Sequence, residues 1–327
     1  MTFVKVSDII INAKNEIIIV FHILLIDFLL EEKREIVFLN SFDANPIYCE
    51  CYVQDNADKN MVILHGFTEF SPKYRETVSY FLKLNYNVFV FDQRGHGLSY
   101  REAEDLNLIH INSFKNYVKD LDFIIEKLVK IKGKDLPIHL FSHSMGGAVS
   151  LLYMMQNCRE IEKAVLSSPM ISPVTKGVPR FFVMLMVAFH GIFLGWKRPF
   201  VFAGKFDPDV KIKDTLDTSP SRFNSTMEIR KSKKEYQSAA STNKWMWNAL
   251  AVQDKLMRKS KLKKIESQVL IVSAEKETIV KNEFHPKVAR FIKNSKLVTI
   301  PCAKHNIFFS SGKTLEDYYS LVFDFLI

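Results

Sequence analysis

The stretch 138–148 limits the possible folds of this chain more than any other. It reads Ile-His-Leu-Phe-Ser-His-Ser-Met-Gly-Gly-Ala, so an apolar, strand-like run meets a helical pattern at a Ser flanked by small residues. This is the strand–turn–helix layout of a nucleophile elbow, G-x-S-x-G, in which a strained turn exposes the hydroxyl of the central residue, here Ser144. Gly146 and Gly147 remove Cβ atoms that would collide with the strand beneath. Ser142 replaces the first Gly of the motif, and Ser- and Gly-rich turns also occur in ordinary loops, so the motif alone does not decide the function.

Short apolar strands alternate with helical patterns on both sides of this elbow. The expected strands cover residues 35–39, 47–53, 61–64, 88–91, 137–141, 164–166, 269–272 and 296–300, and the expected helices cover 74–84, 117–131, 144–158, 287–292 and 317–326. Strands that alternate with helices predict right-handed crossovers and a mainly parallel sheet flanked by helices, which is an α/β fold. The 327 residues are enough for one large α/β domain or two ordinary domains.

The alternation stops between residues 173 and 264 and then resumes. This segment shows no strand-like alternation, and it holds all three Trp residues. An insertion that leaves and re-enters a sheet on one side predicts a helical cap over the carboxyl ends of the strands, where ligands of open α/β sheets bind. We therefore expect a core formed by residues 1–172 and 265–327, with a cap at 173–264.

An amphipathic helix is expected at about residues 14–30, where it would cover the fold. Its apolar part, 17–30, is shorter than the ~20 residues that a membrane span requires, and a membrane-associated helix is the alternative. The N-terminus has one Lys before Asp8 and no small-residue cleavage site, which argues against a signal peptide. Cys49 and Cys51 lie two apart on one strand face, and the chain has no C-x-x-C motif, so free thiols in a reducing compartment are expected. These features predict a cytoplasmic protein, with peripheral contact at the inner face of the membrane as a further hypothesis.

The net charge of +9 is unevenly distributed along the chain. Such basic clusters are either solvated helix faces or attractors of anionic surfaces, namely nucleic acid or phospholipid. No zinc-ligand spacing, RNA-binding aromatic signature or helix-turn-helix pattern accompanies them, so nucleic acid is not an expected partner. The first basic cluster is Arg230, Lys231, Lys233 and Lys234, and the second is Lys255, Arg258, Lys259, Lys261, Lys263 and Lys264.

A Ser hydroxyl is a weak nucleophile, so Ser144 requires a base and an acid that orients the base. In hydrolases with a nucleophile elbow the order along the chain is Ser, then Asp or Glu, then His. Glu275 and Glu277 both follow the strand 269–272, and position alone leaves both open as the acid. Of the nine His residues only His285 and His305 lie downstream of these carboxylates. His285 falls in a helical stretch, so His305, in the loop after the next strand, is the predicted general base, with a solvated loop His as the alternative.

The oxyanion hole is expected to combine two backbone N–H groups. One belongs to Met145, directly after the nucleophile, and the other to Phe67, in the loop after the strand 61–64. Loss of one such donor typically lowers the rate by about 10²–10³. This constellation implies no metal and no cofactor.

Taken in chain order, these motifs resemble the lysophospholipase/monoacylglycerol lipase family of α/β-hydrolases, a serine aminopeptidase-like group, and above all its bacterial lysophospholipase branch. The matching segments are 65–69 (HGFTE), 91–99 (FDQRGHGLS), 142–147 (SHSMGG), 216–223 (LDTSPSRF) and the segments around Glu277 and His305. The resemblance implies an α/β-hydrolase fold with an inserted helical cap, and a serine carboxylester hydrolase that acts on lysophospholipid or monoacylglycerol through Ser144, His305 and Glu277.

Two positions depart from the family pattern. The family usually has Gly at the position of Ser142 and Asp at that of Glu277, although Glu is chemically sufficient. The register of residues 278–280 favours Glu277 over Glu275 as the acid. In the segment 92–99 we expect Arg94 and His96 to tie down the turn rather than to act in catalysis.

The apolar run 181–196 bears on the substrate. It is either an ordinary buried cap helix or an exposed face, and as a membrane span it is short and broken by Gly191 and Gly195. An exposed apolar face of this size would be too large for a monomer without a lipid or membrane to meet. An exposed apolar face bordered by the basic clusters would favour substrates presented at an anionic bilayer. Each CH₂ group that is buried there contributes roughly 0.8 kcal/mol to the free energy of binding.

Two other functions remain open at this level. A proline-iminopeptidase-like serine peptidase would use the same triad, but it needs an acidic residue to hold the substrate amine, whereas the cap is rich in Phe, Trp and Lys. A hydrolase-fold protein without catalysis would act as a binding module, and the presence of both Ser144 and His305 argues against it. The sequence leaves acyl-chain preference, headgroup preference and oligomeric state open.

Overall fold

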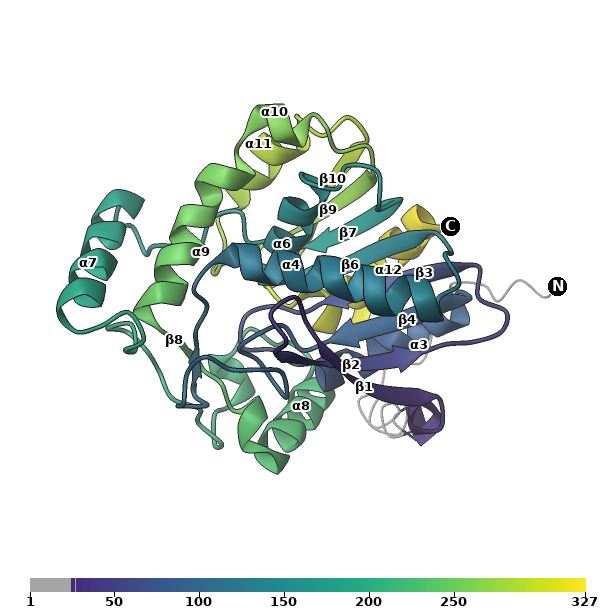
Figure 1. Ribbon diagram of the computed structural model, residues 1–327, viewed down its shortest axis with the longest axis horizontal. Helices are drawn as coiled ribbons and strands as arrows, with labels where there is room; N and C mark the ends of the chain where they lie inside the picture. Colours follow the sequence, from purple (N-terminus) through teal and green to yellow (C-terminus); the bar gives the residue numbers. More distant parts are fainter. Residues whose placement is uncertain (1–24, 27) are drawn as a thin grey trace.

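The structure, a computed structural model, describes residues 25–26 and 28–327 and is built on an eight-stranded sheet (Figure 1). The strand order is β1-β2-β4-β3-β6-β7-β9-β10. Strands β1 and β2 are antiparallel, as are β2 and β4, and all other neighbours in this sheet are parallel. The strands are β1 (Arg34–Asn40), β2 (Pro46–Tyr52), β3 (Lys59–Leu64), β4 (Tyr86–Phe91), β6 (Ile138–His143), β7 (Lys163–Ser167), β9 (Gln268–Ala274) and β10 (Ser295–Ile300). The mainly parallel α/β fold that the sequence predicts is therefore confirmed.

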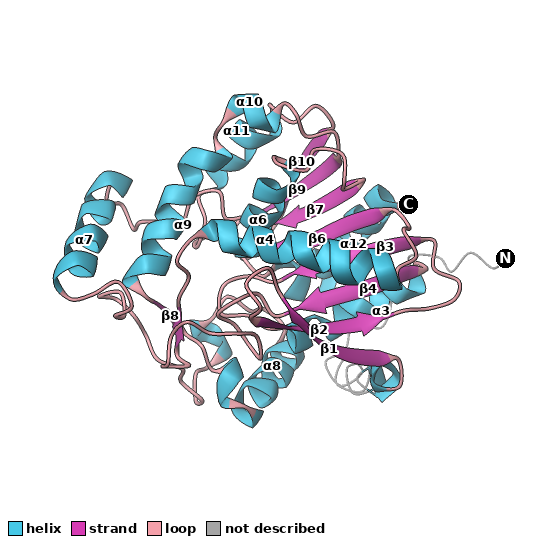
Figure 2. Cartoon of the chain, in the orientation of Figure 1, coloured by secondary structure: helices cyan, strands magenta, loops and turns pink. Residues whose placement is uncertain are grey.

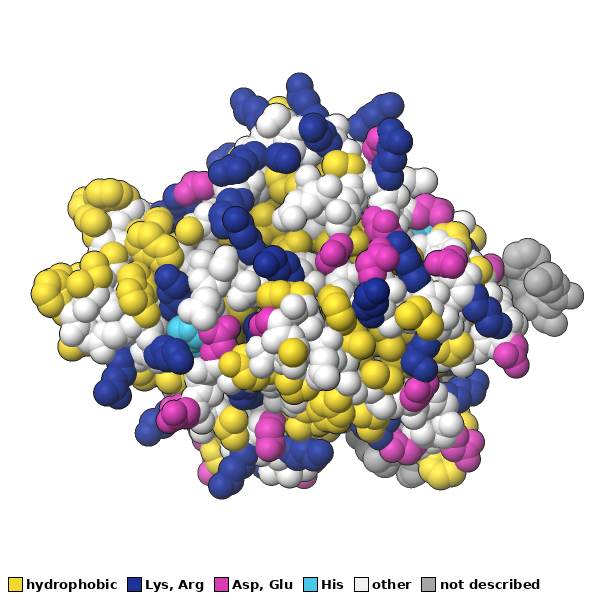
Figure 3. Space-filling view, viewed as in Figure 1, with side chains coloured by type: hydrophobic (Ala, Val, Ile, Leu, Met, Phe, Trp, Pro, Cys, Tyr) yellow, Lys and Arg dark blue, Asp and Glu magenta, His cyan; other side chains and the backbone are white. Residues whose placement is uncertain are grey.

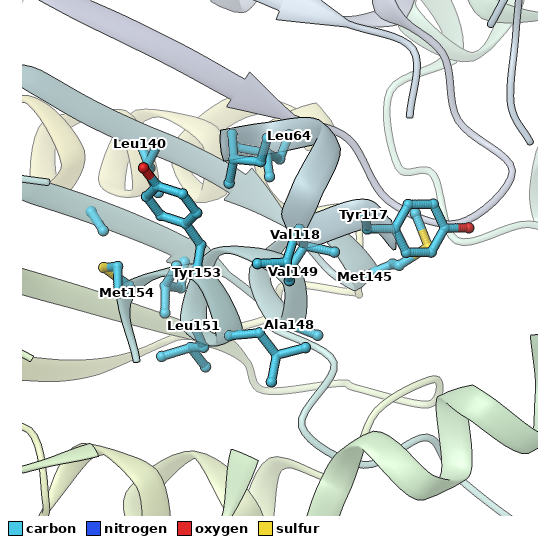
Figure 4. Close-up of a cluster of buried hydrophobic side chains, with 14 of the residues drawn as sticks. Leu64, Tyr117, Val118, Leu140, Met145, Ala148, Val149, Leu151, Tyr153 and Met154 are labelled. Carbon is cyan, nitrogen blue, oxygen red and sulfur yellow. The ribbon is translucent and has the colours of Figure 1, made fainter. Parts of the chain in front are cut away.

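Two apolar layers cover the two faces of this sheet. Successive side chains of a strand point to opposite faces, and β3 shows this directly: Val62 and Leu64 belong to one buried cluster, and Met61 and Ile63 to the other. Figure 4 shows the first cluster, where Leu64 faces side chains of α4 and α6. The second cluster includes side chains of α3 and α12. Because both faces are covered, central strands such as β4 and β6 are continuous buried runs.

The helices of the core follow the expected positions with shifted ends. They are α3 (Arg75–Lys83), α4 (Phe114–Ile124), α5 (Lys130–Lys132), α6 (Met145–Met154), α11 (His285–Ala289) and α12 (Gly312–Leu326). A π-helical turn, Ile125–Val129, joins α4 to α5, so the single helix expected at 117–131 is one continuous helical stretch with an irregular middle.

Four helices lie between β7 and β9. They are α7 (Arg180–Phe193), α8 (Pro220–Ser232), α9 (Asn243–Leu256) and α10 (Lys259–Leu262). A two-residue strand, β8 (Ala240–Ser241), pairs with β5 (Leu108–Ile109), so the expectation of no strand between residues 173 and 264 was wrong at this point. Two residues are too short to display alternation, and the sequence therefore carried no signal for β8.

The apolar helix α7 projects from one end of the molecule (Figure 2). It contacts α9, yet most of its large apolar side chains are exposed, and Val187 is the exception that is fully buried. The sequence left open whether this helix is buried or exposed, and the structure gives the exposed alternative. Figure 3 shows the resulting group of apolar side chains over α7.

A buried ion pair fixes α8 to the core. The guanidinium group of Arg222 donates to both carboxylate oxygens of Glu76, at 2.7 and 2.6 Å, and to the carbonyl oxygen of Ser310 at 3.1 Å. Arg222 lies in the segment 216–223 that carries part of the family resemblance, and its side chain is 1% exposed. Arg222 therefore ties α8 to helix α3 through the ion pair and to the segment before α12 through the Ser310 carbonyl.

Most of the N-terminal helix expected at about 14–30 lies outside the described residues. Of that region, residues 25–26 and 28–30 are helical, and Ile26 and Leu30 are buried against the core. Within the described part of the chain, none of the helices has both the length and the apolar character needed to cross a bilayer.

Candidate active site

The turn between β6 and α6 has the strained geometry of a nucleophile elbow. Ser144 has φ 50° and ψ −113°, a left-handed conformation that non-glycine residues rarely adopt. A Cβ atom on Gly146 would lie 2.3 Å from the carbonyl oxygen of Leu64, in β3, as expected from the sequence. A Cβ atom on Gly147 would lie 2.7 Å from the side chain of Pro169, which follows β7, so this glycine makes room for a loop rather than for a strand.

Three side chains distant in the sequence form one hydrogen-bonded chain. His305 Nε2 lies 2.9 Å from Ser144 Oγ, and His305 Nδ1 lies 2.8 Å from Glu277 Oε2. The imidazole of His305 is 5% exposed and the carboxylate of Glu277 is 2% exposed. The loops that follow β6, β9 and β10 carry these residues, and the carboxyl ends of parallel strands meet at one edge of the sheet, so the fold brings them together.

The carboxylate of Glu277 is held in the ionised form. Burial alone would raise its pKa, but the hydrogen bond from His305 and those from backbone N–H groups lower the pKa to about 2. Its Oε1 atom accepts from the N–H groups of Thr278, Ile279 and Val280, at 2.9, 2.8 and 3.3 Å. The register of residues 278–280 thus turns Glu277 toward His305.

The other candidates from the sequence lie elsewhere. Glu275 is exposed, and its Oε2 accepts the backbone N–H of Cys302 at 2.8 Å, so its carboxylate does not meet the His305 imidazole. His285 begins α11 and is fully buried, with its ring between Ser273 Oγ and the carbonyl oxygen of Pro169. Both contacts support the ends of β9 and β7 rather than a reaction.

Burial favours the neutral form of the His305 imidazole. Burial lowers the pKa of His305 below its ordinary value, and this effect outweighs the hydrogen bond from Glu277, which raises the pKa. A neutral imidazole whose Nδ1–H is bound to a carboxylate presents its Nε2 lone pair to Ser144. This arrangement can accept a proton from the Ser144 hydroxyl.

The sequence assigns the oxyanion hole to the backbone N–H groups of Met145 and Phe67. Met145 is the first residue of α6, so its N–H has no partner within the helix. Among the described residues, no group accepts a hydrogen bond from the N–H of Phe67. The loop that carries Phe67 is held by Gly66, whose N–H donates to Glu69 at 2.6 Å, and by His65, whose Nε2 accepts from the N–H of Gln93 at 2.8 Å.

A second buried network supports the His305 loop, and sequence reasoning missed it. The ring of His143 lies between two acceptors: Nδ1 is 3.2 Å from Glu69 Oε2, and Nε2 is 3.2 Å from the carbonyl oxygen of His305. Nearby Lys73 and His143 keep the pKa of Glu69 well below its ordinary value against the effect of burial, so its carboxylate accepts. The 74-residue separation of His143 and Glu69 left no signal in the sequence, although both lie in recognised motifs.

Helix α9 packs against the loop that carries Phe67. The Trp245 ring packs on the Phe67 ring with a centroid distance of 4.0 Å, and Trp245 Nε1 donates to Tyr117 at 3.3 Å. Ser144 is 5% exposed and His305 is 4% exposed, so the hydroxyl and the imidazole are closed off from solvent.

The turn after β4 is structural, as expected. Arg94 pairs with Asp43 at 2.8 Å and with Asp120 at 2.7 Å, and His96 is fully buried. Across residues 25–26 and 28–327, no three His, Cys, Asp or Glu side chains are grouped as metal ligands.

Comparison with known proteins finds a matching family, relatives by sequence and a similar solved structure. The family described as serine aminopeptidase, S33, matches residues 55–311. A probable lysophospholipase L2 of Haemophilus influenzae is 29% identical over 269 residues, which cover 82% of this chain and 83% of that protein. Lysophospholipase L2 of Escherichia coli is 30% identical over 149 residues, covering 46% of this chain and 43% of that protein. A soluble variant of monoglyceride lipase from Saccharomyces cerevisiae superposes with a TM-score of 0.68 at 18% identity, covering 90% of this chain and 95% of that one.

Proposed function

The chain belongs to the serine aminopeptidase S33 family of α/β-hydrolases, and we propose that it is a serine carboxylester hydrolase acting on monoacyl lipids, either lysophospholipids or monoacylglycerols. The hydrogen-bonded chain Ser144–His305–Glu277 is the observation that carries this proposal. It is supported by similarity to proteins named lysophospholipase and monoglyceride lipase. No step of the proposed reaction requires a cofactor.

In the proposed reaction, Ser144 Oγ attacks the ester carbonyl while His305 Nε2 takes the hydroxyl proton. Glu277 keeps the other imidazole nitrogen protonated and stabilises the imidazolium that forms. The N–H groups of Phe67 and Met145 stabilise the oxyanion of the tetrahedral intermediate. His305 then donates its proton to the leaving alcohol, and an acyl-enzyme remains. A water molecule, activated by the same imidazole, releases the fatty acid.

We also propose that residues 173–264 form a cap whose outer face meets a membrane peripherally. Phe182, Phe189 and Phe193 on α7 are 59, 63 and 69% exposed. The face drawn in Figure 3 shows apolar side chains over α7 and Lys and Arg side chains over α10. Apolar side chains favour the acyl region of a bilayer, and each Lys near an anionic surface adds about 1 kcal/mol. The inner face of the cytoplasmic membrane is the proposed location.

Vesicle co-sedimentation tests the membrane contact. Charge reversal at Lys259, Lys261, Lys263 and Lys264 is expected to weaken binding to anionic vesicles and to lower activity on vesicle-borne substrate, while activity on a water-soluble ester stays constant. If activity is indifferent both to anionic vesicles and to these substitutions, the membrane contact is refuted.

A substrate panel tests the proposed function. Monoacylglycerols, lysophospholipids, short p-nitrophenyl esters and aminoacyl amides are compared with the same enzyme preparation, and the first two are expected to be hydrolysed. Labelling with a fluorophosphonate is expected to disappear in Ser144→Ala and to persist in Ser150→Ala, a matched change at a buried Ser of α6, the helix that follows Ser144. Persistent labelling of Ser144→Ala would point to another nucleophile.

The family description keeps a second candidate open, a proline-iminopeptidase-like serine peptidase. Preferential hydrolysis of the aminoacyl amides would favour it over the lipid esterase. A protein that takes no label and hydrolyses no member of the panel would instead be a catalytically inactive binding protein.

A further inference from the structure

A groove of about 320 Å³ lies between α4, α6 and the junction of α9 with α10. It is separate from the Ser144 site. Leu152 in α6 and Met155 at its C-terminal end lie eight and eleven residues after Ser144, which is roughly 12–17 Å at the rise of an α-helix. Its lining residues are Lys115, Val118, Leu152, Met155, Gln156, Lys255, Arg258 and Lys261.

The charge of this groove has one sign. Four of its lining side chains are cationic and none is acidic, whereas the neighbouring groove lined by Lys263, Lys264 and Lys293 includes Glu266. Among the described residues, no carboxylate forms an ion pair with any of these four cations. Figure 3 shows Lys and Arg side chains beside apolar ones on the face where α4 and α9 lie.

Two of these cations, Lys115 and Arg258, act electrostatically on a third, Lys255. Burial lowers the pKa of Lys255, and the charges of Lys115 and Arg258 lower it further. The first turn of α4 contains no acidic residue, so the positive end of its helix dipole adds to the same potential. A bound anion would relieve this repulsion, and the groove is therefore suited to a negatively charged group.

The floor of the groove is apolar. Val118, Leu152 and Met155 supply it, and all three belong to the buried cluster between α4, α6 and the sheet. Lysine side chains can add apolar methylene surface to such a floor while their ammonium groups reach solvent. Cations alone would suit an inorganic anion, but an apolar floor beneath them matches a ligand that has an alkyl chain next to its charged group.

We propose that this groove binds a single-chain carboxylate amphiphile, such as a medium-chain fatty acid. The carboxylate meets the ammonium and guanidinium groups of Lys115, Lys255, Arg258 and Lys261, and the alkyl chain lies along Val118, Leu152 and Met155. A lipid that remains in a bilayer keeps its chains there and leaves the floor empty, so a free amphiphile fits the groove better than a membrane surface does. The site is independent of the proposed hydrolysis.

Binding of dodecanoate below its micellar concentration tests the proposal, with the full chain labelled at Ser144 by a fluorophosphonate so that the catalytic site is blocked. Calorimetric titration is expected to show one site. Lys255→Glu/Lys261→Glu is expected to weaken binding at least roughly tenfold, since hydrogen bonds to charged groups contribute more than neutral ones. Lys255→Gln/Lys261→Gln is expected to give a smaller loss. Lys233→Glu/Lys234→Glu, the same charge change in the other basic cluster, is expected to leave binding unchanged.

Four results would overturn the proposal. Equal binding by the groove and control variants would place dodecanoate elsewhere. Inorganic phosphate binding as tightly as dodecanoate would make the groove a plain anion site, and dodecanol binding as tightly would remove the role of the charges. Binding of the groove cations to anionic vesicles without any binding of monomeric dodecanoate would assign them to a membrane surface. If the chain takes no fluorophosphonate label, the unlabelled protein is titrated, and the comparison of variants still decides the question.

Discussion

Replacing Glu277 by Gln tests the proposed triad at its acid. The carboxylate uses both oxygens: Oε1 accepts three backbone N–H groups, and Oε2 accepts from His305 Nδ1. A Gln side chain has only one oxygen, and its NH₂ group can only donate. One side of the residue must therefore place a donor against a donor, unless its neighbour changes protonation.

The geometry decides which side keeps the oxygen. Turning the amide oxygen toward the backbone retains three hydrogen bonds, whereas turning it toward His305 retains one. At about 1 kcal/mol for each hydrogen bond, the first orientation is favoured by roughly 2 kcal/mol, or about 30-fold. The NH₂ group then faces Nδ1 of His305 and forces the proton to Nε2. In this tautomer the imidazole has no lone pair for the Ser144 proton, so kcat is expected to fall by about 10³–10⁴.

Steady-state hydrolysis of a p-nitrophenyl ester measures this loss, and thermal unfolding checks that the variant is folded. Glu275→Gln is the matched control: it removes an exposed carboxylate two residues away and is expected to keep kcat within about twofold. A Glu277→Gln enzyme within tenfold of the parent kcat would refute the tautomer argument and the assignment of Glu277. A large loss in Glu275→Gln instead would reassign the acid.

Three further results are expected. Burial lowers the pKa of His305, so its neutral form persists below pH 6.5, the approximate pKa of an ordinary imidazole. We therefore expect kcat/KM to fall on acidification with a midpoint below about pH 6.5. A midpoint above pH 7 would contradict this expectation. Arg222→Met removes the guanidinium group that pairs with the buried carboxylate of Glu76. Denaturant titrations are expected to show a free energy of unfolding lower by about 3–5 kcal/mol. A loss under 1 kcal/mol would show that the pair does not anchor α8. Gly146→Ala places a Cβ atom against a backbone carbonyl oxygen and is expected to lower the free energy of unfolding by about 3 kcal/mol or more. Gly204→Ala is the control, because its added Cβ atom would meet nothing within 4 Å, and it should be neutral. Equal stabilities of the two variants would refute the close-approach argument.

The site could be read from the sequence to the extent that its signals are local. The elbow at Ser144 and the loop with His305 each follow an apolar strand, and parallel strands end at one edge of a sheet. These two side chains could thus be placed together without knowing any other contact. The acid was harder, because Glu275 and Glu277 lie two residues apart in one loop. What separates them is the backbone of residues 278–280, whose N–H groups turn Glu277 inward while Glu275 meets the N–H of Cys302.

Features that depend on tertiary partners could not be predicted. His143 stands beside the nucleophile in the sequence, yet its bonds to Glu69 and to the His305 carbonyl arise only when the end of β6 meets two loops from elsewhere in the chain. The pairing of β8 with β5 joins segments more than 130 residues apart, and neither strand is long enough to show a periodic pattern. In both cases the sequence shows the residues themselves but not the distant residues with which they pair.

Helix α7 shows why an apolar run does not by itself define a buried element. A run of this composition predicts a helix, but whether its apolar side chains find partners depends on elements elsewhere in the chain. Phe181, Phe182, Phe189, Ile192 and Phe193 remain more than half exposed. At about 1.5–3 kcal/mol for each fully buried side chain of this size, the burial that the fold forgoes here is on the order of 5–10 kcal/mol. Folded proteins are only marginally stable, so they seldom leave this much apolar surface in water unless it is buried against another apolar phase. The exposed apolar surface of α7 is therefore the physical reason to look for its binding partner in a lipid surface.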